Sequence, residues 1–196
     1  MTELSLRERS KAKRRRAIQL EGMRLFAERG YDATTVADIA EAAEVSARSV
    51  SMYFPTKLDI ALASSNASAS RLTQALAKRL AGESSVDVVA RWLADERDAV
   101  DEQEQTLRAR MFAANPALTA TGTAETEALN RMAATTLADD LEVDVTHVAI
   151  AVLSGVFAGA LQGMLLDTAT SPQALTAHKA ALQGATSAVQ AALSDS

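Results

Sequence analysis

The chain has 196 residues, of which 42 are alanine, 8 glycine, 3 proline and none cysteine. Collagen-like, low-complexity and disulfide-stapled folds need residues that are scarce or absent here, whereas alanine favours helices, so the composition predicts an all-α protein. Residues 1–60 hold 11 basic and 9 acidic side chains, and residues 61–196 hold 9 and 16. This asymmetry predicts that the N-terminal part meets a polyanion while the acidic remainder avoids it.

Basic side chains crowd the first sixteen residues, where seven Lys or Arg face two Asp or Glu. Basic arms often enter the minor groove of DNA or follow its backbone, so we predict DNA contacts for Lys13 and Arg14. The alternative is a solvated run of charge. Because no apolar run precedes Ile18 and cysteine is absent, we expect a cytoplasmic protein without a secretory signal.

Two helices are predicted between residues 14 and 43. The first spans about residues 14–29 and ends at Gly30, a residue typical of helix C-termini. The second begins after Thr35, because Asp38 three residues later completes the pattern of a capping box. The apolar residues that follow Thr35 recur at helical spacing and predict one buried face.

A third helix is predicted from Ser46 to Phe54, after a break at Glu44-Val45, and the three helices together form a helix-turn-helix unit. Val50 and Phe54 point inward, so the outward side chains are small or polar and suit insertion into a major groove. In that groove Arg48 could form two hydrogen bonds to a guanine. The alternative is a short polar surface helix in which Arg48 pairs with Glu44. The residues predicted to face DNA are Ser46, Ala47, Arg48, Ser49, Ser51 and Met52.

Residues 30–57 closely resemble the signature of the tetracycline-repressor (TetR) family. The matching segments are Gly30-Tyr31-Asp-Ala-Thr34-Thr35-Val36-Ala37-Asp38-Ile39-Ala40, Val45-Ser46 and Tyr53-Phe54-Pro55-Thr56-Lys57. The resemblance implies a homodimeric, effector-responsive transcriptional regulator whose third helix reads the major groove. It also implies that Thr35, Tyr53 and Lys57 meet DNA phosphates, and we add the neighbouring Thr34 to the predicted contacts.

Two positions depart from the family pattern. Glu44 stands where the family commonly has glycine, so a residue with a Cβ has to adopt a strained turn. Ser51 stands where the family commonly has a first tyrosine, and its side chain reaches less far. Both departures bear on the DNA contacts and not on the fold.

From residue 57 onward the pattern predicts a helical bundle, which gives about nine helices in all. We assign residues 1–56 to a DNA-binding domain and residues 57–196 to an effector-binding and dimerisation domain. The acidic run between Asp95 and Glu104 is interpreted as a solvated face, so we expect no metal. The sequence has no serine–histidine–acid grouping, phosphate-binding loop or ligand-spaced histidine pair, so we expect no cofactor and no enzyme. The expected helices run from Lys57 to near Gly82, Val86 to about Phe112, Thr123 to Leu141, Val145 to Asp167 and Pro172 to Leu193.

Small residues line one face of each of the last two helices. Three glycines recur at i, i+4 and i+8, and their cost in helix propensity predicts that another helix approaches closely. We interpret both faces as an interface between two subunits, and the alternative is packing within one subunit. The predicted interface residues are Ala151, Gly155, Gly159, Gly163, Ala177, Ala181, Ala185 and Ala188.

Few bulky side chains occur beyond residue 85, and in an alanine-rich bundle they can line a cavity for a small apolar effector. The alternative is that they fill an ordinary core and that the DNA-binding dimer has no small effector. The predicted lining comprises Trp92, Met111, Phe112, Met132, Phe157 and Met164, with Arg108 and His147 as polar partners. We expect no membrane partner, because the apolar stretch 147–166 contains His147, Ser154 and Gln162 and fits a buried helix.

Residues 107–118 carry a second resemblance. Leu107-Arg-Ala-Arg-Met-Phe112 and Pro116-Ala-Leu118 are similar to a subgroup of actinobacterial regulators that includes those of the mycofactocin system. In that subgroup the implied effectors are acyl-CoA molecules.

Overall fold

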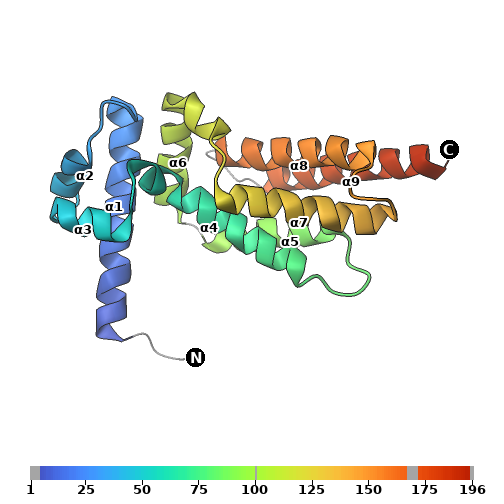
Figure 1. The fold of residues 1–196 in the computed structure, drawn as a ribbon, viewed down its shortest axis with the longest axis horizontal. Coiled ribbons are helices and arrows are strands. Elements are labelled where there is room, and N and C mark those ends of the chain that lie inside the picture. The colour runs from blue at the N-terminus through green and yellow to red at the C-terminus, as the bar shows by residue number, and fades with distance from the viewer. Residues whose placement is uncertain (1–4, 100, 167–171, 195–196) are drawn as a thin grey trace. The chain divides into compact units, whose positions relative to one another are not determined.

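The computed structural model describes residues 5–99, 101–166 and 172–194, and the regular secondary structure in these ranges is helical, as predicted (Figure 1). Within them no helix is long and apolar enough to cross a bilayer. The helices are α1 (Leu6–Arg29), α2 (Val36–Ala42), α3 (Ala47–Tyr53), α4 (Lys57–Ala77), α5 (Ser85–Ala99), α6 (Glu102–Ala114), η1 (Pro116–Ala120, a 3-10 helix), α7 (Ala124–Leu141), α8 (Val148–Leu166) and α9 (Pro172–Ser194).

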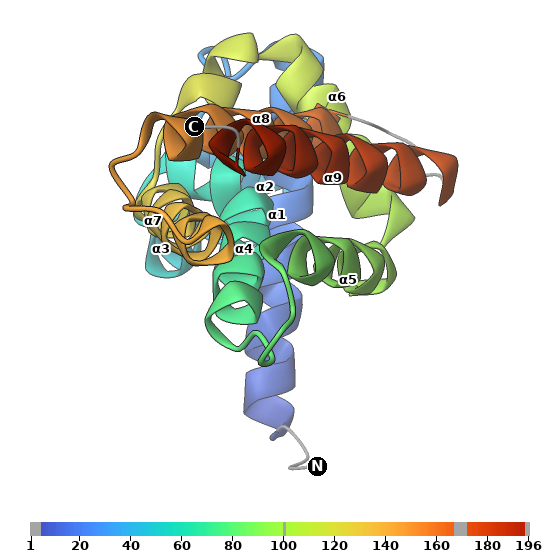
Figure 2. The same ribbon diagram turned by 90° about the vertical axis from the view of Figure 1, so that its right-hand side faces the viewer.

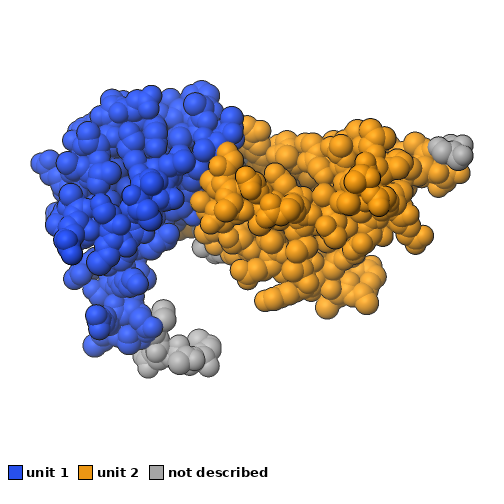
Figure 3. Space-filling model, viewed as in Figure 1, with its two compact units in different colours: residues 1–64, 102–121 blue, residues 65–101, 122–196 orange. Residues whose placement is uncertain are grey.

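Packing divides the chain into two compact units, which Figure 3 distinguishes by colour. Unit 1 comprises residues 1–64 and 102–121, and unit 2 comprises residues 65–101 and 122–196. The division falls inside α4, and α6 joins unit 1 although it follows α5 in sequence. This division describes packing, so the functional boundary between residues 56 and 57 stays a prediction.

Helix α1 begins earlier than predicted. The hydroxyl of Ser5 accepts a hydrogen bond from the backbone N–H of Glu8 at 3.2 Å, and the Glu8 carboxylate accepts one from the N–H of Ser5 at 2.9 Å. This capping box starts the helix at Leu6 instead of near residue 14. The hydrogen bonds from Ser5 also lower the pKa of Glu8. The basic arm is therefore helical from residue 6 onward.

The core of unit 1 joins α1, α2, α3, the start of α4 and α6. Ile18, Phe26, Val50 and Ile60 are fully or almost fully buried in it. Gly22 lets α1 approach α4, because a Cβ at this position would lie 2.5 Å from the Cγ2 atom of Ile60. Any larger residue at Gly22 would push these two helices apart.

Unit 2 packs the rest of α4 with α5, α7, α8 and α9, and α8 and α9 lie side by side in Figures 1 and 2. Its core is built from large aliphatic side chains, including the fully buried Leu137 and Leu153. The soft segment 64–70 of α4 stays helical, as predicted. There Glu96 of α5 accepts hydrogen bonds from the Ser68 hydroxyl and from the Nε of Arg71, the latter at 2.7 Å.

Besides the start of α1, three predicted helices differ from the structure. The helix expected over residues 86–112 is two helices, α5 and α6, because its acidic middle offers no apolar face that would bind both halves to one core. Helix α4 ends at Ala77, five residues before the positive-φ Gly82. Helix α8 begins at Val148, because Asp144 accepts from the N–H of Thr146 at 2.8 Å and so forms a turn instead of a cap. The predicted end of that helix, Asp167, lies outside the described residues.

Candidate nucleic-acid interface

The turn between α2 and α3 has the geometry that the sequence predicts. Thr35 caps α2, and its hydroxyl accepts a hydrogen bond from the N–H of Asp38 at 3.2 Å. Ser46 caps α3 in the same way through the N–H of Ser49 at 3.1 Å. Glu44 has a φ of +55°, so the strained conformation expected at this non-glycine position is present.

Helix α3 buries one side and exposes the other. Val50 is fully buried, whereas Arg48 and Ser51 are exposed and 73% of the surface of Met52 is accessible. Ala47 is exposed and Ser49 is half-buried. No ion pair between Arg48 and Glu44 occurs within the described part of the chain, so the alternative role considered for Arg48 is not seen.

Thr34 is a correction to the predicted DNA contacts. Its side chain is fully buried, and its hydroxyl donates to the carbonyl oxygen of Gly30 at 2.8 Å. The hydroxyl therefore fastens the end of α1 to the following loop and cannot reach a phosphate. No sequence pattern indicates this burial, because Thr34 and Thr35 differ only in which side of the loop they face.

Lys57 has two partners inside the protein. Its ammonium donates to the carbonyl oxygens of Tyr31 at 2.7 Å and Thr34 at 3.0 Å, and it lies 4.2 Å from the centre of the Tyr31 ring. Burial, with smaller contributions from Asp32 and Asp59, raises the pKa of Tyr31. Lys57 thus fixes the loop before α2 to the start of α4, and its predicted phosphate contact has one N–H left to use.

Carboxylates already occupy the N-termini of α2 and α4. The Asp38 carboxylate accepts from the N–H and hydroxyl of Thr35 at 2.7 and 2.6 Å, and these bonds lower the pKa of Asp38. Asp59 accepts in the same way from Thr56 at 2.8 and 2.7 Å. A phosphate at Thr35, as predicted, would meet a hydroxyl whose proton is already donated to Asp38.

The helical arm exposes Lys13 and Arg14, whereas its next two arginines contact the protein. The guanidinium of Arg15 lies 4.7 Å from the centre of the Phe54 ring, and Arg16 forms an ion pair with Glu104 at 3.3 Å. In Figure 1 the first turns of α1 extend past α2 and α3 within unit 1. The arm is thus a projecting basic helix whose outer charges face solvent.

The way in which α6 packs against α1 and the loop after it was not predicted from the sequence. The side-chain amide of Asn115 donates to the carbonyl oxygens of Phe26 at 2.9 Å and Met111 at 2.7 Å, and its oxygen accepts from the N–H of Tyr31 at 2.6 Å. Glu104 accepts from the Nε2 of Gln19 at 2.9 Å. The only local signal was the break at Asn115-Pro116, because the α1 and Tyr31 partners lie more than 80 residues away in sequence.

Comparisons with known proteins agree with this geometry. Residues 20–63 match the family described as bacterial regulatory proteins, tetR family. The chain thus carries the DNA-binding region of TetR-family transcriptional regulators. Members of this family are DNA-binding proteins and not enzymes, so the helix-turn-helix serves DNA binding. Among curated proteins none matches this sequence, and the second resemblance, to mycofactocin-system regulators, is not shown.

Two solved structures share the fold of this chain. A tetR-family transcriptional regulator from Streptomyces coelicolor is 20% identical with a TM-score of 0.55, over 93% of this chain and 83% of that one. A putative TetR-family regulator from Mesorhizobium loti is 19% identical with a TM-score of 0.52, over 93% and 97%. RolR in complex with resorcinol is 21% identical with a TM-score of 0.45, over 90% and 89%.

The residues predicted to line one effector cavity are divided between the two units. Met111 and Phe112 are buried in the core of unit 1, where α6 meets α1, and Arg108 is buried on the same helix. Trp92 and Phe157 are buried in the core of unit 2, with Met132 packed against it. His147 is exposed before α8, where its Nδ1 accepts from the N–H of Ala149 at 3.2 Å. The side chain of Met164 lies outside the described part of the structure.

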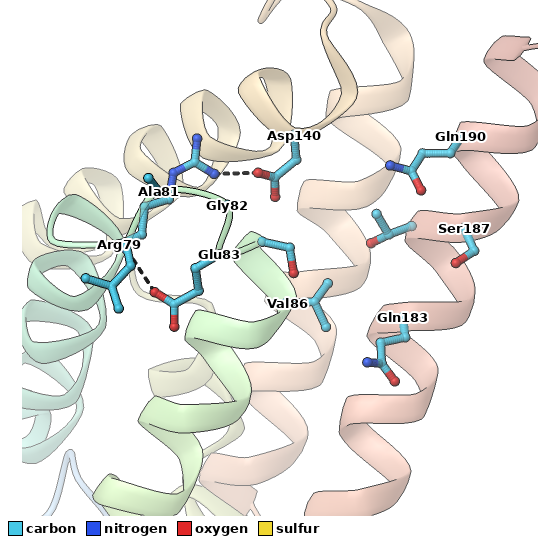
Figure 4. A pocket seen from close by; sticks show the side chains of 12 residues that line it. Arg79, Ala81, Gly82, Glu83, Val86, Asp140, Gln183, Ser187 and Gln190 are labelled. Carbon is cyan, nitrogen blue, oxygen red and sulfur yellow. Dashed lines mark hydrogen bonds and ion pairs between the residues drawn. The ribbon is translucent and has the colours of Figure 1, made fainter.

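Two hollows in unit 2 bear on the effector. A small hollow of about 20 Å³ is lined mostly by apolar side chains, including Phe157, and by the polar side chains of Ser85, Asn130, Thr136 and Ser154. This volume holds about one water molecule. A larger surface hollow of about 710 Å³ is lined by polar and apolar side chains alike, and Figure 4 shows Arg79 reaching Asp140 on one side of it and glutamines of α9 on the other. None of its lining residues is among those predicted to hold the effector.

One face of α8 is apolar and exposed in this regulator. Val148 and Val152 are 71% and 56% exposed, and Val156 also reaches the surface. A Cβ added at Gly155 or Gly159 would meet no atom within 4 Å, so neither glycine packs against its own chain. The valines were missed from the sequence although Val148, Val152 and Val156 repeat at the same four-residue spacing as the glycines.

The other predicted interface residues differ in their surroundings. A Cβ at Gly163 would lie 3.5 Å from the Nε2 of His178, so this glycine abuts α9 of the same chain. Ala185 is half-buried against the core. The remaining members, Ala151, Ala177, Ala181 and Ala188, are exposed.

Proposed function

We propose that this TetR-family regulator is a cytoplasmic homodimer that binds a palindromic DNA operator through α3 and represses transcription until a small apolar effector releases it. The observation that carries the proposal is the exposed apolar face of α8. Contiguous apolar surface of this kind marks an interaction site on a water-soluble protein. The open glycines Gly155 and Gly159 between exposed valines support contact with another chain over packing within one subunit.

The small-residue face of α9 extends this surface. Ala177, Ala181 and Ala188 are exposed on one side of α9, while Leu182 is buried on another. A two-fold axis would bring α8 and α9 of both subunits together in a four-helix contact, with the same residues on each side. Two copies of α3 about 34–36 Å apart would then read two half-sites of one palindrome.

The experiment that tests the dimer is Gly159→Leu. No atom of the same chain obstructs a side chain there, so the protomer should fold, whereas two leucines would enter the interface. At about 1–3 kcal/mol for each overpacked site, dissociation rises by about 30- to 20,000-fold. Sedimentation should show a monomer, and fluorescence anisotropy should show loss of operator binding.

Ser187→Leu is the matched control, because it places the same side chain at an exposed position of α9 that borders the surface hollow of about 710 Å³. This variant should remain dimeric and bind DNA as the wild type does. A Gly159→Leu protein that is dimeric with normal operator affinity would refute the assigned interface.

The DNA contacts belong to the same proposal. Arg48, Met52, Ala47 and Ser51 would enter the major groove, while Ser46 and Ser49 hold the start of α3 through their hydroxyls, which lie 2.9 Å apart. Phosphates would be met by the side chains that remain from the prediction, which are Lys13, Arg14, Thr35, Tyr53 and Lys57. The support is the exposure of the arm and of α3 within unit 1.

Effector release would require the small hollow beside Phe157 in unit 2 to enlarge. Ligand sites of small molecules measure about 300–1,000 Å³, whereas the hollow beside Phe157 measures about 20 Å³. An effector that binds in this hollow would therefore require a state in which the surrounding helices have moved apart. That difference in affinity between two states is what an effector needs in order to change DNA binding.

The same small hollow favours a second candidate, a DNA-binding dimer that has no small effector. Thermal shift of the intact protein with a library of apolar compounds separates the two. A compound that raises the melting temperature and also weakens operator binding supports effector release. Stabilisation by none of them, with operator binding unchanged throughout, supports the second candidate.

A further inference from the structure

The outward face of α3 has two residues at its centre. Successive residues of an α-helix turn by about 100°, so Arg48 and Met52 lie on the side of α3 opposite the fully buried Val50. Ala47 and Ser51 lie on one flank. On the other flank Ser49 and Tyr53 are half-buried.

The hydroxyls at the start of α3 are already used within the protein. Ser46 accepts from the N–H of Ser49 at 3.1 Å, and the two hydroxyls lie 2.9 Å apart. Arg48, by contrast, has no ion pair among the described residues, and the Met52 side chain is 73% exposed. If α3 faces DNA, as proposed above, an apolar group on the DNA would bury this large exposed side chain.

In the major groove each of these two side chains has one matching base edge. The guanidinium of Arg48 fits the O6 and N7 acceptors of guanine with two hydrogen bonds. The apolar partner for Met52 is the C5-methyl group of thymine, which is the apolar group that this groove presents. The flexible thioether side chain of Met52 can follow the position of that methyl group.

We propose that Arg48 and Met52 set the operator sequence, so that each half-site contains a guanine read by Arg48 and a thymine read by Met52. The two residues are four apart in α3, which places them about 6 Å apart along the helix axis. Since base pairs are stacked about 3.4 Å apart, the guanine and thymine lie one or two steps from each other. This inference rests on the proposed function, because it requires α3 to lie in the major groove.

The test begins with operators selected from random DNA by the intact protein, followed by single-atom changes in the DNA. Deoxyuridine in place of the thymine removes only the methyl group, and wild-type affinity should fall about fourfold. For 7-deazaguanine, which lacks the N7 acceptor, the fall should lie within the range of about 5- to 150-fold typical of a bidentate base contact. Fluorescence anisotropy measures both changes.

Variants then assign each atom to a side chain. Met52→Ala should bind more weakly than wild type and lose its response to deoxyuridine, and Arg48→Ala should lose its response to 7-deazaguanine. Lys13→Gln is the control, because a phosphate contact carries no sequence information, so its weaker binding should keep both responses.

The possible failures are distinguishable. A selected palindrome to which wild-type protein binds equally well with thymine or deoxyuridine overturns the assignment of Met52. Full sensitivity of Arg48→Ala to 7-deazaguanine overturns the assignment of Arg48. Either result leaves the proposed function standing, whereas selection that enriches no sequence overturns the proposed function and this inference with it.

Discussion

Gly22 offers a direct test of the packing of α1 against α4 in unit 1. In Gly22→Ala the new Cβ would lie 2.5 Å from the Cγ2 atom of Ile60, far inside the usual carbon–carbon contact of about 3.5–4.0 Å. Ile60 is fully buried, so its methyl group has no space into which to move. Overpacking of this kind lowers the free energy of unfolding by about 1–3 kcal/mol. Alanine has a higher helix propensity than glycine, which raises the same free energy by about 1 kcal/mol.

The expected net loss for Gly22→Ala is about 0–2 kcal/mol, which lowers the melting temperature by up to about 8 °C for a chain of this size. Thermal unfolding followed by far-UV circular dichroism measures it. Gly184→Ala is the matched control, because Gly184 is an exposed residue of α9 whose Cβ would meet no atom within 4 Å. That control should be more stable by up to about 1 kcal/mol. A Gly22→Ala protein as stable as Gly184→Ala would refute the close approach of α1 to α4.

Three further predictions concern unit 1. Asn115→Ala removes three hydrogen bonds, two of which join the end of α6 to the end of α1 and the loop after it. Urea unfolding should therefore show a loss of about 1–3 kcal/mol, and a loss below about 0.5 kcal/mol would contradict this role. The pKa of Asp38 is lowered in the folded state, so Asp38 stabilises the fold fully above its unfolded pKa of about 3.9, and this stabilisation disappears as pH falls through the folded pKa. In Asp38→Asn the free energy of unfolding should therefore depend less steeply on pH below about pH 4. A Lys13→Gln, Arg14→Gln double variant should weaken binding to all DNA and reduce the salt slope by about 0.9 for each phosphate that the arm no longer neutralises, and an unchanged slope would exclude the arm.

Patterns confined to a few residues were predictable from the sequence. The caps at Thr35 and Ser46 each depend on a side chain that reaches three residues along the chain, and both are present. The same logic applied to Ser5 and Glu8 would have found the true start of α1. The strained turn at Glu44 was also visible, because a residue other than glycine stands in a tight turn.

Features that depend on contacts between distant segments were not predictable. Met111 looks like any other bulky residue in the sequence, and only the packing of α6 on α1 places it in the core of unit 1. The burial of Thr34 and the carbonyl partners of Lys57 likewise depend on how the loop folds back on α1 and α4. These interactions changed the candidate site, because they removed one predicted DNA contact and gave another residue a second role.

The central claim is that two copies of α3, held by a dimer, read one palindrome. Selection of bound sequences from a random DNA library by the intact protein tests this claim most directly. We predict an enriched inverted repeat whose half-site centres lie about 10–10.5 base pairs, or a multiple of this, apart. Enrichment of a single unrepeated site, or of no sequence at all, would contradict the account.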